Sequence, residues 1–90
     1  MDDADLAEKM QCYRCHKEVR AAKIIGIVRD VSGVPKYAMV ELPNRDVGRF
    51  QPTSMEMLVR AVIGDYAVLY RDNYKSISPA KEFEDGYAAI

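Results

Sequence analysis

Residues 65–86 read Asp65-Tyr-Ala-Val-Leu-Tyr-Arg-Asp72-Asn73-Tyr-Lys-Ser-Ile-Ser78-Pro79-Ala-Lys-Glu-Phe-Glu-Asp-Gly86, and this stretch decides the fold. Two runs rich in tyrosine and aliphatic residues flank Asp72 and Asn73, which both tolerate the positive φ angles of a two-residue hairpin turn. Ser78 is a typical helix N-cap, Pro79 suits the first helical position, and Gly86 is a typical C-terminal stop. The stretch predicts a β-hairpin, with strands over 65–71 and 74–77, that runs into a short capped helix over 80–85.

A two-residue turn would fix the register of this hairpin. Arg71 would lie opposite Tyr74 and Val68 opposite Ile77, which makes the face of Val68 and Ile77 the expected core side. The other face would reach the start of the helix, where free backbone N–H groups and the helix dipole favour anions. We therefore predict a site for a phosphate or carboxylate there, formed by Arg71, Tyr74, Ser76, Ser78 and Lys81. The same residues also fit plainer roles, as a helix cap, a solubilising edge charge and ordinary sheet side chains.

Three more strands are predicted before this hairpin, over 19–29, 37–42 and 47–51, with turns at 30–35 and 43–46. Thr53 and Glu56 then have the spacing of a capping box. Apolar residues follow at helical spacing and predict an amphipathic helix that Gly64 ends; they are Met55, Leu58, Val59 and Val62. The expected order is β-β-β-α-β-β-α, an α+β fold with a single antiparallel sheet of about five strands and two short helices covering one face.

The length of 90 residues suits one domain and is too short for two independent cores. We expect residues 1–15 to form a loosely ordered or short helical leader and residues 16–90 to form a single α+β domain. The chain lacks the apolar run of about 20 residues that a membrane span needs, and its acidic beginning differs from a secretory signal. These features predict a cytoplasmic protein.

The charge of the chain is unevenly distributed, although the net charge is only −1. From Lys9 to Lys36 there are seven basic residues against two acidic ones, Glu18 and Asp30. A general nucleic-acid binder usually has a basic overall balance, so that function is not expected. A local basic surface for a small anion or for an acidic partner protein remains open.

Cys12-Tyr-Arg-Cys15-His16 matches the C-x-x-C-H pattern of covalent haem attachment. Haem attachment generally requires export, and the sequence predicts none. Zinc is a second interpretation, but Cys12, Cys15 and His16 supply three ligands where a structural zinc site needs four. A thiol redox role would require the pair at the start of a helix. Two free thiols in the leader are the plainest alternative, and we expect no cofactor.

The C-terminal third, Gly64-Asp65-Tyr66 through Phe83-Glu84-Asp85-Gly86-Tyr87, resembles the ending of a group of small accessory proteins from tailed bacteriophages and prophages. Their pattern is roughly G-D-Y-x-V-x-Y-x-D-G-Y-x-S-x-S-P-x-x-x-F-E-x-G-Y, and the segment from His16 to Ile24 is similar to their beginning. Asn73 stands where the pattern has glycine, and Cys15 also departs from it. The resemblance implies a phage accessory protein in the cytoplasm of a bacterial host, and it brings no catalytic residue.

Three functions are compatible with these features. The first is a non-enzymatic binding protein that counteracts a bacterial host factor, either by sequestering a small anionic, nucleotide-like ligand or by blocking a host protein. The second is a structural or assembly component of the virion, and the third is a metal or redox module that uses Cys12, Cys15 and His16. We expect no enzyme, because phosphate-binding loops and catalytic serine motifs are absent from the sequence. A homodimer would protect the exposed edges of such a small sheet.

Overall fold

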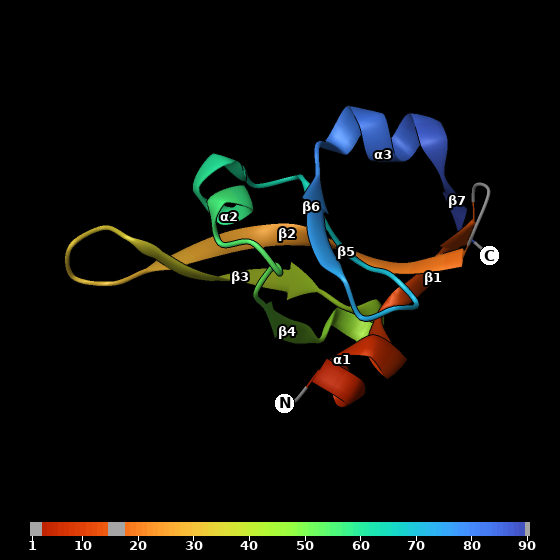
Figure 1. Cartoon of the computed structure of the whole chain (residues 1–90). Helices are drawn as coiled ribbons and strands as arrows, with labels where there is room; N and C mark the ends of the chain where they lie inside the picture. Colours follow the sequence, from red (N-terminus) through yellow and green to blue (C-terminus); the bar gives the residue numbers. More distant parts are fainter. Residues whose placement is uncertain (1–2, 15–17, 90) are drawn as a thin grey trace.

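The computed structural model describes residues 3–14 and 18–89, and Figure 1 shows their arrangement. The elements in chain order are α1 (Asp3–Lys9), β1 (Gln11–Arg14), β2 (Glu18–Arg29), β3 (Pro35–Glu41), the 3-10 turn η1 (Pro43–Arg45), β4 (Val47–Phe50), α2 (Glu56–Arg60), β5 (Tyr66–Leu69), β6 (Lys75–Ser78), α3 (Ala80–Gly86) and β7 (Ala88–Ala89). None of the helices in this described part is long and apolar enough to cross a membrane.

Five main strands form one antiparallel sheet in the order β4-β3-β2-β5-β6, which confirms the predicted α+β class. The long strand β2 is its centre: residues 23–29 pair with β3, and residues 20–23 pair with β5. Residues 18–21 of β2 also pair with β1, which in turn pairs with the two-residue strand β7. The sequence does not predict β1 and β7, because neither segment has an alternating apolar pattern.

The sheet is covered on both faces. Ala67 and Leu69 of β5 point into the larger core together with Leu58 of α2. Val68 of the same strand points into a smaller core together with Phe83 of α3. Because alternate residues of a strand face opposite sides of a sheet, α2 and α3 lie on opposite faces. The prediction that both helices cover one face is therefore wrong.

The predicted register of the β5–β6 hairpin is also wrong, by one residue. Val68 pairs with Ser76 and Ala67 pairs with Ile77, so the loop has three residues and not two. A three-residue loop of this kind needs a left-handed residue at its third position, and Asn73 takes this role with a φ angle of 69°. The one-residue shift moves every β6 side chain to the other face, and Ile77 packs against the larger core.

The capping box predicted before α2 does not form. The Thr53 hydroxyl accepts the N–H of Lys75 at 2.8 Å, and the Thr53 N–H donates to the Lys75 carbonyl. Thr53 is therefore hydrogen-bonded to the edge of β6 and not to the helix. α2 ends at Arg60, earlier than the predicted stop at Gly64. Of the predicted apolar stripe only Leu58 is buried in the core.

The last helix begins at Ala80, as predicted, but its N-cap is one residue later than predicted. Ser78 belongs to β6, and Pro79 is the N-cap of α3. The first N–H of the helix, from Ala80, donates to Asp65 Oδ1 at 3.3 Å. The second oxygen of Asp65, Oδ2, accepts the N–H of Val62 at 3.0 Å. This buried carboxylate therefore occupies the helix start, where the sequence predicts a site for an external anion.

Aromatic stacking holds α3 on its face of the sheet. The Phe83 ring stacks on the Tyr66 ring at 4.4 Å between centroids and on the Tyr87 ring at 4.7 Å. The Tyr66 hydroxyl donates to Glu84 Oε2 at 2.8 Å, and Lys23 Nζ lies 3.9 Å from the same oxygen. Tyr66 therefore anchors the helix through its ring and through its hydroxyl, as buried tyrosines commonly do.

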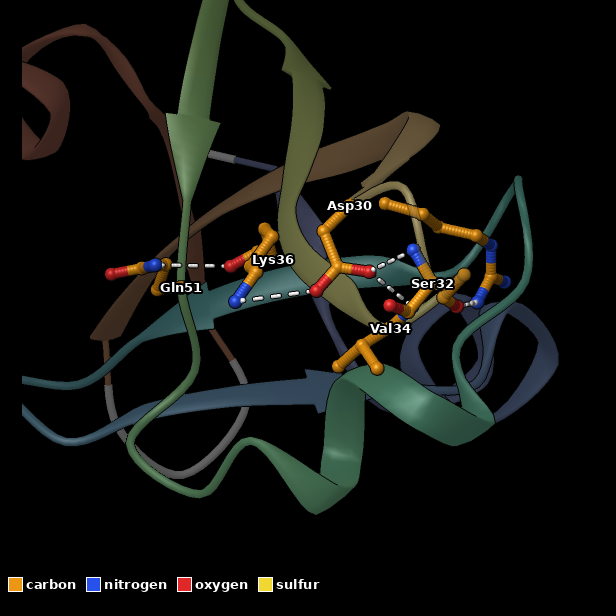
Figure 2. A network of polar contacts seen from close by, with 7 residues as sticks. Asp30, Ser32, Val34, Lys36 and Gln51 are labelled. Carbon is orange, nitrogen blue, oxygen red and sulfur yellow. Dashed lines mark hydrogen bonds and ion pairs between the residues drawn. The ribbon is translucent and has the colours of Figure 1, made fainter.

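The loop between β2 and β3 is closed by its own polar groups (Figure 2). Asp30 Oδ1 accepts the N–H groups of Ser32 and Val34 at 2.9 and 3.0 Å. Asp30 Oδ2 lies 3.6 Å from Lys36 Nζ, and Gln51 donates to the Lys36 carbonyl at 3.0 Å. The hydrogen bond from Val34 is the main cause that lowers the pKa of Asp30 below its ordinary value.

The N-terminal segment packs against the larger core. Leu6 and Met10 are buried, and both belong to that core. The Leu6 side chain approaches the backbone of β4 at Gly48, where a built Cβ would lie only 2.6 Å from Leu6 Cδ1. Glycine at this position therefore makes room for α1. Within the predicted leader, residues 3–9 are helical and residues 11–14 form a strand of the sheet.

Candidate functional site

A cleft of about 340 Å³ opens beside the β5–β6 turn, between this turn and the N-terminal segment. We call it the turn cleft, and its polar or reactive lining residues are Cys12, Arg20, Tyr70, Arg71 and Asn73. These residues come from β1, from β2 and from the hairpin turn. The cleft therefore brings together segments that are far apart in the sequence.

The backbone of the turn is held by hydrogen bonds. Tyr70 N–H donates to the Tyr74 carbonyl at 2.9 Å, and Asn73 N–H donates to the Tyr70 carbonyl at 3.0 Å. Asp72 Oδ1 accepts the N–H of Tyr74 at 3.0 Å, as aspartates in turns often do. These bonds fix the backbone on which Arg71 is presented, so the Arg71 side chain starts from an ordered position.

Arg20 enters the cleft from the central strand. Its Nη1 donates to the Met10 carbonyl at 3.1 Å, which ties the guanidinium to the end of α1. A guanidinium has five N–H donors, and this hydrogen bond uses one of them. Arg20 lies opposite Leu69 in the β2–β5 pairing, so it borders the hairpin close to the turn.

The two guanidinium groups make the cleft a cationic site. Within residues 3–14 and 18–89, no carboxylate lies within ion-pair distance of Arg20 or Arg71. Both residues are exposed, so their charges are accessible to an anion from solution. Paired arginines favour phosphate and carboxylate groups, because a guanidinium donates two parallel hydrogen bonds to such a group.

A second hollow of about 430 Å³ adjoins the turn cleft and shares two of its residues. It is lined by Tyr70, Arg71, Asp72 and Tyr74. The rings of Tyr70 and Tyr74 are tilted against each other, with 5.8 Å between their centroids. Tyr74 is 42% exposed, which leaves aromatic surface beside the cationic groups.

The structure brings together only part of the predicted anion site. Arg71 and Tyr74 line the same hollow at the turn. Ser76 and Ser78 lie further along β6, where they pair with Val68 and Tyr66. Lys81 is in α3, which Figure 1 shows at the other end of β6 from the turn.

The cysteine motif is described only in part. Cys12 is a free, half-buried thiol in β1 and lines the turn cleft. Cys15 and His16 lie outside the described residues. Among the described residues, no group of three or more histidine, cysteine, aspartate or glutamate side chains is placed to hold a metal ion. The metal or redox hypothesis therefore stays a prediction.

Sequence reasoning misses Arg20 as a site residue. The segment around it reads Val19-Arg20-Ala21-Ala22, and its apolar neighbours indicate only a buried strand. The side chain of Arg20 lies on the same face as Ala22, a member of the larger core. A charged residue on an otherwise apolar strand face is the available signal, because such a residue tends to stay at the surface, where it can bind a partner.

Comparison with known proteins adds no relative. No protein-family model, no curated protein and no solved structure matches the chain. The resemblance to small phage and prophage accessory proteins therefore stays a prediction.

Proposed function

We propose that this chain is a non-enzymatic binding protein that holds a small anionic, nucleotide-like ligand in the turn cleft. The observation that carries this proposal is the joint lining of one cleft by Arg20 and Arg71, two exposed cations from separate elements. Two arginines on one cleft repel each other when it is empty. A bound anion would relieve that repulsion and accept charge-assisted hydrogen bonds from both.

The ordered backbone on both sides of the cleft supports binding. Arg20 is tied to Met10, and the turn that carries Arg71 is closed by three hydrogen bonds. Groups that are ordered before the ligand arrives lose less conformational entropy on binding. The cleft therefore has the preorganised character of a binding site.

The neighbouring aromatic hollow supports a nucleotide in preference to inorganic phosphate. The exposed surface of Tyr74 lies beside Arg71, and stacking of a base on an aromatic ring contributes about 1–3 kcal/mol. A phosphate between the arginines would leave a base within the hollow that Tyr70 and Tyr74 line. Asp72 lines the same hollow and offers an acceptor for the amino group of a base.

The biological role that we propose follows from the resemblance to phage accessory proteins. A cytoplasmic phage protein that sequesters a nucleotide would remove a signal or metabolite on which a bacterial host factor depends. The version in which the chain blocks a host protein would use the same cationic cleft for an acidic side chain of that protein.

Calorimetric titration tests the proposal directly. The full chain would be titrated with inorganic phosphate, linear mononucleotides and cyclic dinucleotides at low and at physiological salt. Loss of one charge-assisted hydrogen bond costs about 1.5–3 kcal/mol, so we expect Arg71→Ala and Arg20→Ala each to weaken nucleotide binding about tenfold or more. Thermal melting of each variant would establish that it is folded.

Matched controls lie on the same chain. Ser78 is the last residue of β6 and Lys81 lies in α3, so both are at the opposite end of β6 from the turn cleft. We expect Ser78→Ala and Lys81→Ala to leave nucleotide binding unchanged. Binding lost in these two variants but kept without Arg20 would place the ligand at the start of α3. No binding by any member of the panel would remove the sequestering function.

A further inference from the structure

The outward side of α2 carries apolar side chains. Val59 is 65% exposed, and Val62 and Ile63, directly after the helix, are 61% and 68% exposed. Met55, one helical turn before Val59, is 41% exposed. We call these four residues the α2 patch. Apolar surface gathered in this way marks interaction sites more often than scattered single residues do.

The α2 patch is held rigidly. The N–H of Val62 donates to the buried carboxylate of Asp65, and the N–H of Asp65 donates back to the Val62 carbonyl. The N–H of Gly64 donates to the Ile24 carbonyl at 2.9 Å, which fixes the segment to the central strand. Because the backbone is already ordered, exposed residues such as Ile63 could dock with little further loss of entropy.

Two opposite charges lie on the same side of the helix. Glu56 and Arg60 are both exposed and are separated by four residues, so they project in the same direction, one turn apart. Met55 and Val59 have the same spacing. The helix thus presents one apolar row beside one charged row, with the negative charge at its N-terminal end.

This arrangement is self-complementary. In an antiparallel pair of α2 helices related by a twofold axis at the level of residue 58, Val59 lies within one helical turn of Val59 of the partner subunit. Glu56 then lies level with Arg60 of the partner subunit, and the symmetry produces this opposite-charge contact twice. Met55 then lies near the C-terminal end of α2 of the partner subunit, which is followed by the segment that carries the exposed Val62 and Ile63.

We propose that the α2 patch is the contact surface for a second copy of this chain, which forms an isologous dimer through antiparallel α2 helices. The occupant is a second copy because both the apolar row and the charged row match themselves under a twofold rotation. The surface lies on α2 and its following loop, whereas the turn cleft is formed by other elements. Dimerisation and ligand binding can therefore be tested separately.

Sedimentation velocity of the full chain over a wide concentration range tests the dimer. We expect a shift from monomer to dimer as the concentration rises, and a monomer at every concentration for Val59→Glu. Val31→Glu is the matched control, because Val31 is a fully exposed valine in the β2–β3 loop, outside the patch. We expect this control to dimerise like the original chain.

Charge reversal tests the antiparallel geometry. Glu56→Arg and Arg60→Glu each turn two attractive contacts into two repulsive ones, and from the strength of exposed ion pairs we expect about tenfold weaker association. The double variant Glu56→Arg/Arg60→Glu recreates opposite charges across the axis and should restore dimerisation. A chain that stays monomeric at all concentrations overturns the proposal. A double variant that associates no better than the single variants overturns the antiparallel pairing.

Discussion

The β2–β3 and β5–β6 hairpin turns use the same local chemistry to different ends. In the β2–β3 loop Asp30 accepts the N–H of Ser32, and in the β5–β6 turn Asp72 accepts the N–H of Tyr74, in both cases two residues ahead. Each turn also contains a residue at positive φ, Gly33 in the first and Asn73 in the second. Both are therefore ordered by aspartate and by a left-handed residue.

The two turns differ in the groups that their basic side chains contact. In the β2–β3 loop Lys36 pairs with Asp30, and Arg29 Nη1 donates to the Gly33 carbonyl at 3.3 Å. In the β5–β6 turn Arg71 lines a cleft together with Arg20. The first loop uses its charges to close itself, whereas the second presents its charge to solvent. This contrast indicates which of the two turns is suited to binding an anion.

The largest expected effect on stability concerns the residues with left-handed backbone conformation in the two turns, Gly33 and Asn73. Gly33 has a φ of 85°, and a Cβ atom added to it would have no neighbouring atom within 4 Å. A side chain at this position would therefore be disfavoured by the left-handed backbone conformation and not by a clash. We expect Gly33→Ala to lower the free energy of unfolding by about 1–2 kcal/mol. Gly33→Asn should cost less, because asparagine tolerates this conformation. Denaturant unfolding measures both, and equal costs would contradict the backbone explanation.

A smaller difference is expected where the segment before α2 contacts the two hairpins. The Thr53 hydroxyl accepts a hydrogen bond from the N–H of Lys75 in β6 at 2.8 Å. The Gln51 amide donates one to the carbonyl of Lys36 in β3. We expect Thr53→Val to cost about 1 kcal/mol, because the N–H of the half-buried Lys75 loses its acceptor, and Gln51→Ala less, because the carbonyl of the exposed Lys36 can accept a water instead. Glu56→Ala should change stability little. If Glu56→Ala costs as much as Thr53→Val in thermal unfolding, the rejected capping box exists after all.

The smallest expected effect is a pH dependence in the β2–β3 loop. The folded pKa of Asp30 is lowered, mainly by the Val34 N–H, so the carboxylate stabilises the fold above its ordinary pKa of 3.8. This contribution is lost as the pH falls through the lowered folded value. We expect Asp30→Asn to flatten the acid limb of the melting temperature against pH, and Lys36→Gln to retain most of it. An unchanged acid limb in Asp30→Asn would exclude this contribution.

The sequence predicts the positions of the main strands but not how the last two align. Residues 66–69 of β5 are all buried, because both faces of the strand are covered. A strand without alternation carries no pattern that fixes its register. Asp72 and Asn73 suit a two-residue and a three-residue loop equally well, so tertiary packing of Ile77 against the larger core decides between them.

The candidate site is predictable to the same limited extent. Arg71 and Tyr74 are found from the turn alone, because local chemistry places them at its ends. Arg20 lies beside the hairpin because β2 pairs with β5. The first N–H of α3, from Ala80, donates to Asp65, which lies fifteen residues earlier in the sequence. Contacts of this separation are set by the whole fold and have no local sequence signal.

The carboxylate of Asp65 couples the start of α3 to the β5–β6 hairpin. One of its oxygens accepts the nearby N–H of Val62, and the other accepts the N–H of Ala80, on the far side of the hairpin. A formed hairpin holds the two ends of the intervening chain close together, so it lowers the entropy cost of the bond between Asp65 and Ala80. The capping hydrogen bond of α3 and the hairpin at the centre of the proposed site therefore stabilise each other.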